Sequence, residues 1–284
     1  MSALVLEDVI ARVEQLPKLP DTSLRLMRLV NDPSATLKQI VDVIRYDQAV
    51  TGEVLRLCNS AFYGFNRKIA SLDEAVHYLG TNKVTQLVME AHAQTLLGPA
   101  QSGYGLRPGA LWVHSVGVAI GARRIAERAA PSDAGLLFTA GLMHDVGKVV
   151  LNEYMATDFA RVAAIVTQER IPFCEAEQRV LGTTHAEVGA LLAEKWGLPD
   201  AIVRCIRHHY NPAELSEPDV RVDITHVADA ACTLMGVGGG DDGLMYRPDA
   251  EVAARIGIHE HEIEELGAFI VDELKSVEAL FHRE

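Results

Sequence analysis

Apolar residues recur at helical spacing along almost the whole chain, and this feature limits the fold more than any other. Within residues 34–47, for example, Ile40, Val41 and Ile44 fall on one stripe of a helix. Runs that alternate between apolar and polar residues, which would indicate half-buried strands, are hard to find. The sequence therefore predicts an all-α fold built from amphipathic helices.

Composition narrows the class of protein. Hydrophobic residues make up 49% of the 284 residues and charged residues 23%, values that are typical of a globular protein and unlike a disordered or fibrous chain. The formal net charge is −13. Such an acidic chain disfavours broad electrostatic binding to nucleic acid. We therefore do not expect a nucleic-acid-binding protein.

Targeting features are also scarce. The first residues lack a basic region followed by a long apolar region, and no uninterrupted apolar stretch approaches the ~20 residues that span a bilayer. None of the four cysteines forms a CxxC pair. We expect a cytoplasmic protein with reduced cysteines and no membrane partner.

Glycine and proline mark the domain organisation. The segment 98–109 holds four glycines and two prolines and is typical of a linker or exposed loop. A second glycine-rich loop, 237–243, precedes an acidic helical stretch. The sequence predicts an N-terminal helical subdomain over 1–100, a second helical domain over 101–236 and a C-terminal helical extension over 237–284.

Eleven histidines are the unusual feature of the composition, and several lie on apolar helix faces in segments far apart in sequence. A polar group on an apolar face is costly unless it finds a partner. Imidazole and carboxylate groups that converge from several helices are how helical bundles build metal sites. Such residues suit a divalent transition metal ion such as Fe, Mn, Ni or Zn. The positions concerned are His114, His144 with Asp145, His185, His208 with His209, and Asp229.

Each of these histidines has an ordinary alternative role. Taken alone, any one of them is more often a satisfied core histidine or a surface histidine than a ligand. The pair His208–His209 could cap a helix C-terminus, where histidine is favoured. If Asp229 faces solvent, His226 is the alternative ligand.

The order and spacing of these residues resemble a known signature. His114, then His144-Asp145, then Asp229 resembles the H…HD…D pattern of the HD metal-dependent phosphohydrolase superfamily, and HDVGK (144–148) is similar to the form in HD-GYP cyclic dinucleotide phosphodiesterases. The stretch after the histidine pair lacks a GYP triplet, so the resemblance does not extend to cyclic di-GMP specificity. The resemblance implies two metal ions, with Lys148 facing a phosphate. The first ion would take His114, His144, Asp145 and Asp229, and the second would take Asp145 as a bridge with His185, His208 and His209.

The N-terminal half resembles the HDOD family, the HD-related output domain of bacterial signalling, and the likeness runs from about residue 16 to about 212. It rests on LPKLP (16–20), YDQAVTGEVLRLCNSAFYG (46–64) and SLDEAVHYLG (71–80). Members of that family are generally treated as non-enzymatic signalling modules, and many are degenerate at the HD positions. This chain keeps nearly the full ligand set.

Two functions follow as alternatives. The first is a signal-transduction or regulatory HDOD protein, in which a metal-binding HD core is structural or senses a ligand and a signalling partner protein is bound. The second is a metal-dependent phosphohydrolase, a phosphodiesterase acting on a nucleotide or cyclic nucleotide. There, Asp145 and Lys148 would be catalytic, with Asp145 bridging the two ions and Lys148 stabilising developing charge. A nucleotide ligand and a homodimer through the C-terminal helix stay open.

Overall fold

The computed structural model describes residues 36–45, 48–60, 67–238 and 249–281, together with residues 11, 22, 25, 26, 29, 63 and 65. Within these residues the chain is helical and contains no strand, only an isolated bridge between Gln101 and Leu106. The predicted all-α fold is confirmed. The α-helices are α3 (Leu37–Arg45), α4 (Gln48–Cys58), α5 (Leu72–Leu79), α6 (Thr81–Leu97), α7 (Ala110–Ala129), α8 (Ala134–Met143), α9 (Gly147–Glu169), α10 (Phe173–Leu181), α11 (His185–Lys195), α12 (Asp200–His208), α13 (Val220–Leu234), α14 (Ala250–Arg255) and α15 (Glu260–Phe281). Short 3₁₀ helices are η1 (Ser102–Tyr104), η2 (Pro131–Asp133) and η3 (Pro212–Glu214).

Local sequence explains where α5 begins and ends. The Ser71 hydroxyl accepts a hydrogen bond from the Glu74 backbone N–H at 3.2 Å, and the Glu74 side chain accepts one from the Ala70 N–H at 2.8 Å. These bonds satisfy N–H groups that a helix N-terminus otherwise leaves open. Gly80 then adopts a φ of 78°, which ends α5 and lets α6 leave in a new direction.

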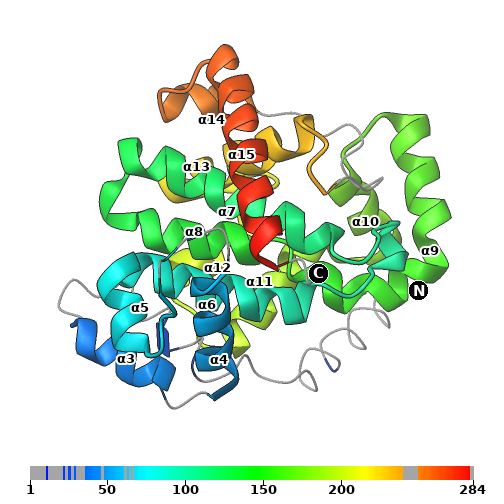
Figure 1. Ribbon diagram of the computed structural model, residues 1–284. Helices are drawn as coiled ribbons and strands as arrows, with labels where there is room; N and C mark the ends of the chain where they lie inside the picture. The colour runs from blue at the N-terminus through cyan, green and yellow to red at the C-terminus, as the bar shows by residue number, and fades with distance from the viewer. Residues whose placement is uncertain are drawn as a thin grey trace.

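Helix α7 lies at the centre of the molecule, with α8 against one side and α13 and α15 against another (Figure 1). Glycines allow these helices to approach closely. A Cβ atom added at Gly141 of α8 would lie 2.8 Å from Ala119 Cα of α7, and one at Gly121 would lie 2.8 Å from Ile270 Cδ1 of α15. The predicted C-terminal extension thus covers α7 rather than projecting into solvent.

Helices α3 to α6 form one end of the molecule, drawn in blue and cyan in Figure 1. Helix α6 connects this end to the rest by packing against α7 and α8. One continuous hydrophobic core runs through both parts. The domain boundaries near residues 100 and 236 stay a prediction.

The segment 98–109 is exposed in part and anchored in part to the rest of the molecule. Tyr104 and Leu106 are buried, and η1 packs against α9. Gly103 makes this contact possible, because a Cβ atom there would lie 2.1 Å from the Asn152 carbonyl oxygen. The Gly103 N–H donates to the Asn152 side-chain oxygen at 2.8 Å. Gly103 therefore serves close packing, a role that composition alone does not distinguish from flexibility.

Among the described residues, one helical stretch, Pro131–Asn152, is long and apolar enough to cross a membrane, with a mean hydropathy of 1.3. Its most apolar window is 83% buried inside the molecule. This burial fits a core segment, because α8 packs against α6, α7, α12 and α13.

Candidate metal centre

Six of the predicted side chains meet in the interior, where five segments come together. His114 comes from α7 and Asp229 from α13. His144 and Asp145 come from the turn between α8 and α9. His185 is the first residue of α11, and His209 follows the last residue of α12.

Gly147 explains why the turn after α8 can carry its two side chains to α11. A Cβ atom added at Gly147 would lie 1.9 Å from the His185 carbonyl oxygen and 2.6 Å from the Gly189 backbone nitrogen. Only glycine permits this approach. The glycine of the HDVGK motif thus brings Asp145 against His185.

Asp145 lies between two pairs of histidines and is almost completely buried. Its Oδ2 atom lies 3.3 Å from His144 Nε2 and 3.7 Å from His114 Nε2. Its Oδ1 atom lies 3.4 Å from His185 Nε2 and 3.9 Å from His209 Nε2. Each carboxylate oxygen therefore faces its own histidine pair, an arrangement that suits a bridging ligand.

Asp229 also faces inward. Its Oδ1 atom lies 3.1 Å from His114 Nε2 and 3.7 Å from His144 Nε2. One ligating atom from each of these three residues lies within 4.8 Å of the other two. Asp145, His144 and His209 form a second such group.

The hydrogen bonds of the histidines show that these residues fit a cation. His144 Nδ1 donates to the Gly141 carbonyl at 2.7 Å, and His209 Nδ1 donates to the Ile206 carbonyl at 2.8 Å. Because a carbonyl only accepts, each Nδ1 carries a proton, and in the neutral ring the Nε2 atom then presents a lone pair. The Nε2 atoms of His144, His185 and His209 are buried without a hydrogen-bond partner. Buried groups left in this state are costly, and a metal ion would satisfy them.

His226 lies outside this group. Its Nδ1 donates to the His209 carbonyl at 2.8 Å, and its Nε2 accepts from the Asp249 backbone N–H at 3.0 Å. Both ring nitrogens are therefore engaged in holding the chain around His209. The inward orientation of Asp229 leaves no role for His226 as the alternative ligand.

His208 is not brought to the cluster. Its Nδ1 lies 3.8 Å from Glu214 Oε2, and no ion pair joins it to Asp145 or Asp229 within the described part of the chain. Helix α12 ends at His208, and neighbouring side chains at a helix end still diverge by about 100°. His209 takes the inward direction and His208 the outward one.

Electrostatics keep Asp145 and His209 in forms that bind a cation. Burial lowers the pKa of His114 and of His185, but Asp229 and Glu177 respectively outweigh this effect and raise both pKa values. Burial raises the pKa of the Asp145 carboxyl, but His144 and Lys148 outweigh this effect and hold that pKa well below its usual range. The Lys148 ammonium donates to Asp145 Oδ2 at 2.6 Å. Burial, with the nearby His144, lowers the pKa of His209 to about 3, so its imidazole is neutral at pH 7.

Sequence reasoning missed Glu177 and Tyr104, which support His185. Glu177 is fully buried, and its Oε2 accepts from His185 Nδ1 at 2.7 Å and from the His185 backbone N–H at 3.1 Å. Its Oε1 accepts from the Tyr104 hydroxyl at 2.6 Å. A carboxylate on the far nitrogen of a metal-binding histidine fixes the ring and raises its basicity. The available signal was helical spacing, since Glu177 falls on the buried stripe of α10 with Phe173 and Leu181.

The sequence model of the HDOD domain family matches residues 16–212 of this chain. A curated relative, an uncharacterized protein of Treponema pallidum (strain Nichols), is 30% identical over 203 residues, which are 70% of this chain and 38% of that protein. The chain thus spans well under half the length of that relative.

Solved structures have the same fold. An HDOD domain protein of unknown function from Geobacter sulfurreducens is 30% identical, with a TM-score of 0.67 over 97% of both chains. A candidate signal transduction protein from Marinobacter aquaeolei VT8 is 25% identical, with a TM-score of 0.78 over 98% of this chain and 64% of the other. A candidate phosphohydrolase from Shewanella amazonensis SB2B, 21% identical with a TM-score of 0.70 over 98% of both chains, shows the fold alone.

Proposed function

The chain belongs to the HDOD family, and from this premise we propose that it is a bacterial signal-transduction protein whose HD core binds divalent transition-metal ions. The observation that carries the metal is the set of three buried Nε2 lone pairs around Asp145. A core histidine cluster without a cation would leave these atoms unsatisfied. Fe, Mn, Ni and Zn all suit such imidazole and carboxylate ligands.

Two ions would share Asp145. His114, His144 and Asp229 would hold the first with Asp145 Oδ2, and His185 and His209 would hold the second with Asp145 Oδ1. The distances from each oxygen to its two histidines support this division. His208 would join the second ion only if the end of α12 turned.

The signalling role rests on the family and on the Marinobacter structure, which is described as a candidate signal transduction protein. The N-terminal helices α3 to α6 would bind the partner protein. Helix α6 touches both α7 and α8, so a change at a partner-binding surface has a direct structural path to the metal ligands.

A second candidate function is hydrolysis of a phosphoester, and Lys148 favours it. Its ammonium group is buried beside Asp145, where a fixed positive charge can stabilise negative charge that develops on a phosphoryl group. Metal ions, when bound, polarise phosphoryl oxygens and make a water molecule more acidic. Asp145 would position both ions, and Lys148 would orient the phosphoryl group.

One experiment separates the two functions. The protein is purified without added metal, its metal content is measured by elemental analysis, and it is assayed with phosphomonoesters, generic phosphodiesters, nucleotides and cyclic dinucleotides. Turnover that Asp145→Asn abolishes would establish the phosphohydrolase. Bound metal without turnover on the whole panel supports the regulatory protein. Protein that stays metal-free after incubation with each of the four metals contradicts both.

A further inference from the structure

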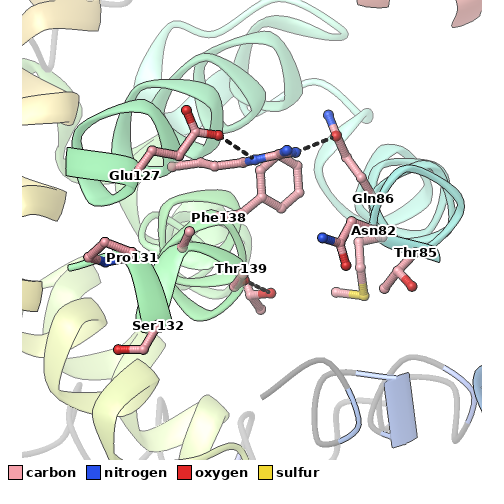
Figure 2. A pocket seen from close by; sticks show the side chains of 12 residues that line it. Asn82, Thr85, Gln86, Glu127, Pro131, Ser132, Phe138 and Thr139 are labelled. Atoms are coloured by element: carbon pink, nitrogen blue, oxygen red, sulfur yellow. Dashed lines mark hydrogen bonds and ion pairs between the residues drawn. The ribbon is translucent and has the colours of Figure 1, made fainter. Parts of the chain in front are cut away.

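A pocket separate from the metal centre lies where α6 meets α7 and α8. It has a volume of about 350 Å³ and is lined by described residues of α6, α7, η2 and α8. This size suits a small organic ligand. Figure 2 shows Gln86 and Glu127 on opposite sides of the pocket, with the ring of Phe138 between them.

Part of the pocket wall is apolar. Phe138 and Met89 are both buried and line the pocket with Pro131 and Ala134. An aromatic ring beside a thioether and small side chains offers a surface for a flat apolar body. The wall therefore favours a ligand that has an aromatic or aliphatic part.

The polar groups of the pocket favour an anion. Arg123 Nη1 donates to Gln86 Oε1 at 2.9 Å and Nε lies 3.4 Å from Glu127 Oε1, while Nη2 has no acceptor among the described residues. An adjoining cavity of about 220 Å³ is lined by two more cations, Lys83 and Arg124, and by the carboxylates of Glu127 and Glu273. The Arg123 guanidinium can therefore donate hydrogen bonds to a further carboxylate, sulfonate or phosphate.

We propose that this pocket binds a small organic anion, with its apolar body against Phe138 and Met89 and its acidic group at Arg123. The ligand would touch α6 of the N-terminal part and α8 of the HD core. Helix α8 runs from this pocket to His144, so ligand binding and metal binding would influence each other. That last coupling rests on the proposed metal centre, whereas the binding itself does not.

The test uses two fluorescent probes that differ in charge, anilinonaphthalene sulfonate and its uncharged analogue phenylnaphthylamine, with chelator-treated protein. We expect one saturable site for the sulfonate. Arg123→Gln should weaken sulfonate binding about tenfold or more, because a charge-assisted hydrogen bond is lost, and should leave the neutral probe unchanged. Glu127→Gln should strengthen sulfonate binding by removing the competing carboxylate. Ala134→Leu should weaken both probes by filling the pocket, and exposed Arg161→Gln on α9 is the matched control.

Three results of this binding assay bear on the proposed anion site. Absence of a saturable sulfonate site overturns the proposal, as does an Arg123→Gln effect that is equal for both probes or is reproduced by Arg161→Gln. Since no metal is present in this assay, a failed metal centre leaves the result intact. A second titration with Zn²⁺-loaded protein then tests the coupling, which must change the affinity for the probe and for Zn²⁺ by the same factor.

Discussion

Replacement of Glu177 by glutamine should selectively weaken the second of the two proposed metal sites. Glu177 accepts three hydrogen bonds, two from His185 and one from Tyr104. Glutamine has the same shape, so its carbonyl can still accept from His185 while its amide donates to the Tyr104 hydroxyl. What disappears is the negative charge on the far side of the His185 ring. Loss of such a partner costs about 10–100-fold in metal affinity, which is about 1.4–2.8 kcal/mol.

The assay is a Co²⁺ titration followed by calorimetry and by visible absorption. We expect two binding events in the unmodified protein. The weaker or later of these events should be the one that involves His185. Glu177→Gln should shift only that event, because His114, His144 and Asp229 make no contact with Glu177. Tyr104→Phe should act in the same direction with a smaller effect, since it removes one donor and keeps the charge.

Glu175→Gln is the matched control. Glu175 lies on the same helix two residues earlier, pairs with Arg179 and has a side chain that is 48% exposed. Two identical Co²⁺ isotherms for Glu177→Gln and Glu175→Gln, with equal thermal unfolding, would refute the role assigned to Glu177. Equal weakening of both sites would mean that Glu177 supports the fold as a whole.

Three further predictions follow from individual residues. Asp145→Asn should lower the metal content towards zero while the helical circular dichroism persists, because both proposed ions would share that carboxylate; retention of full metal content would contradict the bridge. His209→Ala should reduce metal content more than His208→Ala, measured by elemental analysis after reconstitution, because only His209 faces Asp145. Burial raises the pKa of Glu90 to about 7, against the opposing effects of Lys83 and a hydrogen bond from Gln86. Since the folded-state pKa lies above the usual 4.5, the free energy of unfolding falls as pH rises from 4.5 to 7, by about 3 kcal/mol in total. The check is urea unfolding of metal-free protein at pH 4 and at pH 8. The difference in free energy of unfolding between Glu90→Gln and the unmodified protein should favour the variant more at pH 8 than at pH 4. An equal difference at both pH values would contradict this.

The sequence could predict the helices and the inward direction of His114 and Asp229 because both depend on periodicity. A residue's place on a helix face follows from its spacing to apolar neighbours, and this holds for His114 and Asp229 without knowledge of the tertiary fold. The resemblance then joined residues that are far apart in sequence. The structure then adds the distances at which these residues lie around Asp145.

The direction of side chains at helix ends could not be predicted in this way. His208 and His209 are adjacent, and which one faces inward depends on where α12 stops and on the contact between His226 and the His209 carbonyl. That contact joins residues 17 positions apart. Periodicity has no information about such a junction, because the spacing rule applies only inside a helix.

The support for His185 depends on a close backbone contact at Gly103. The glycine-rich composition of residues 98–109 suggested a linker or loop there instead. Gly103 lets η1 lie directly on α9, and this places the next residue, Tyr104, within hydrogen-bond distance of Glu177. A glycine that is needed for close approach and a glycine that is needed for a mobile linker look alike in sequence. The two cases differ in the cost of adding a methyl group. At Gly103, alanine would force η1 away from Asn152 and withdraw the Tyr104 hydroxyl from Glu177, so a change in the segment that joins the two halves of the chain would reach the second metal site.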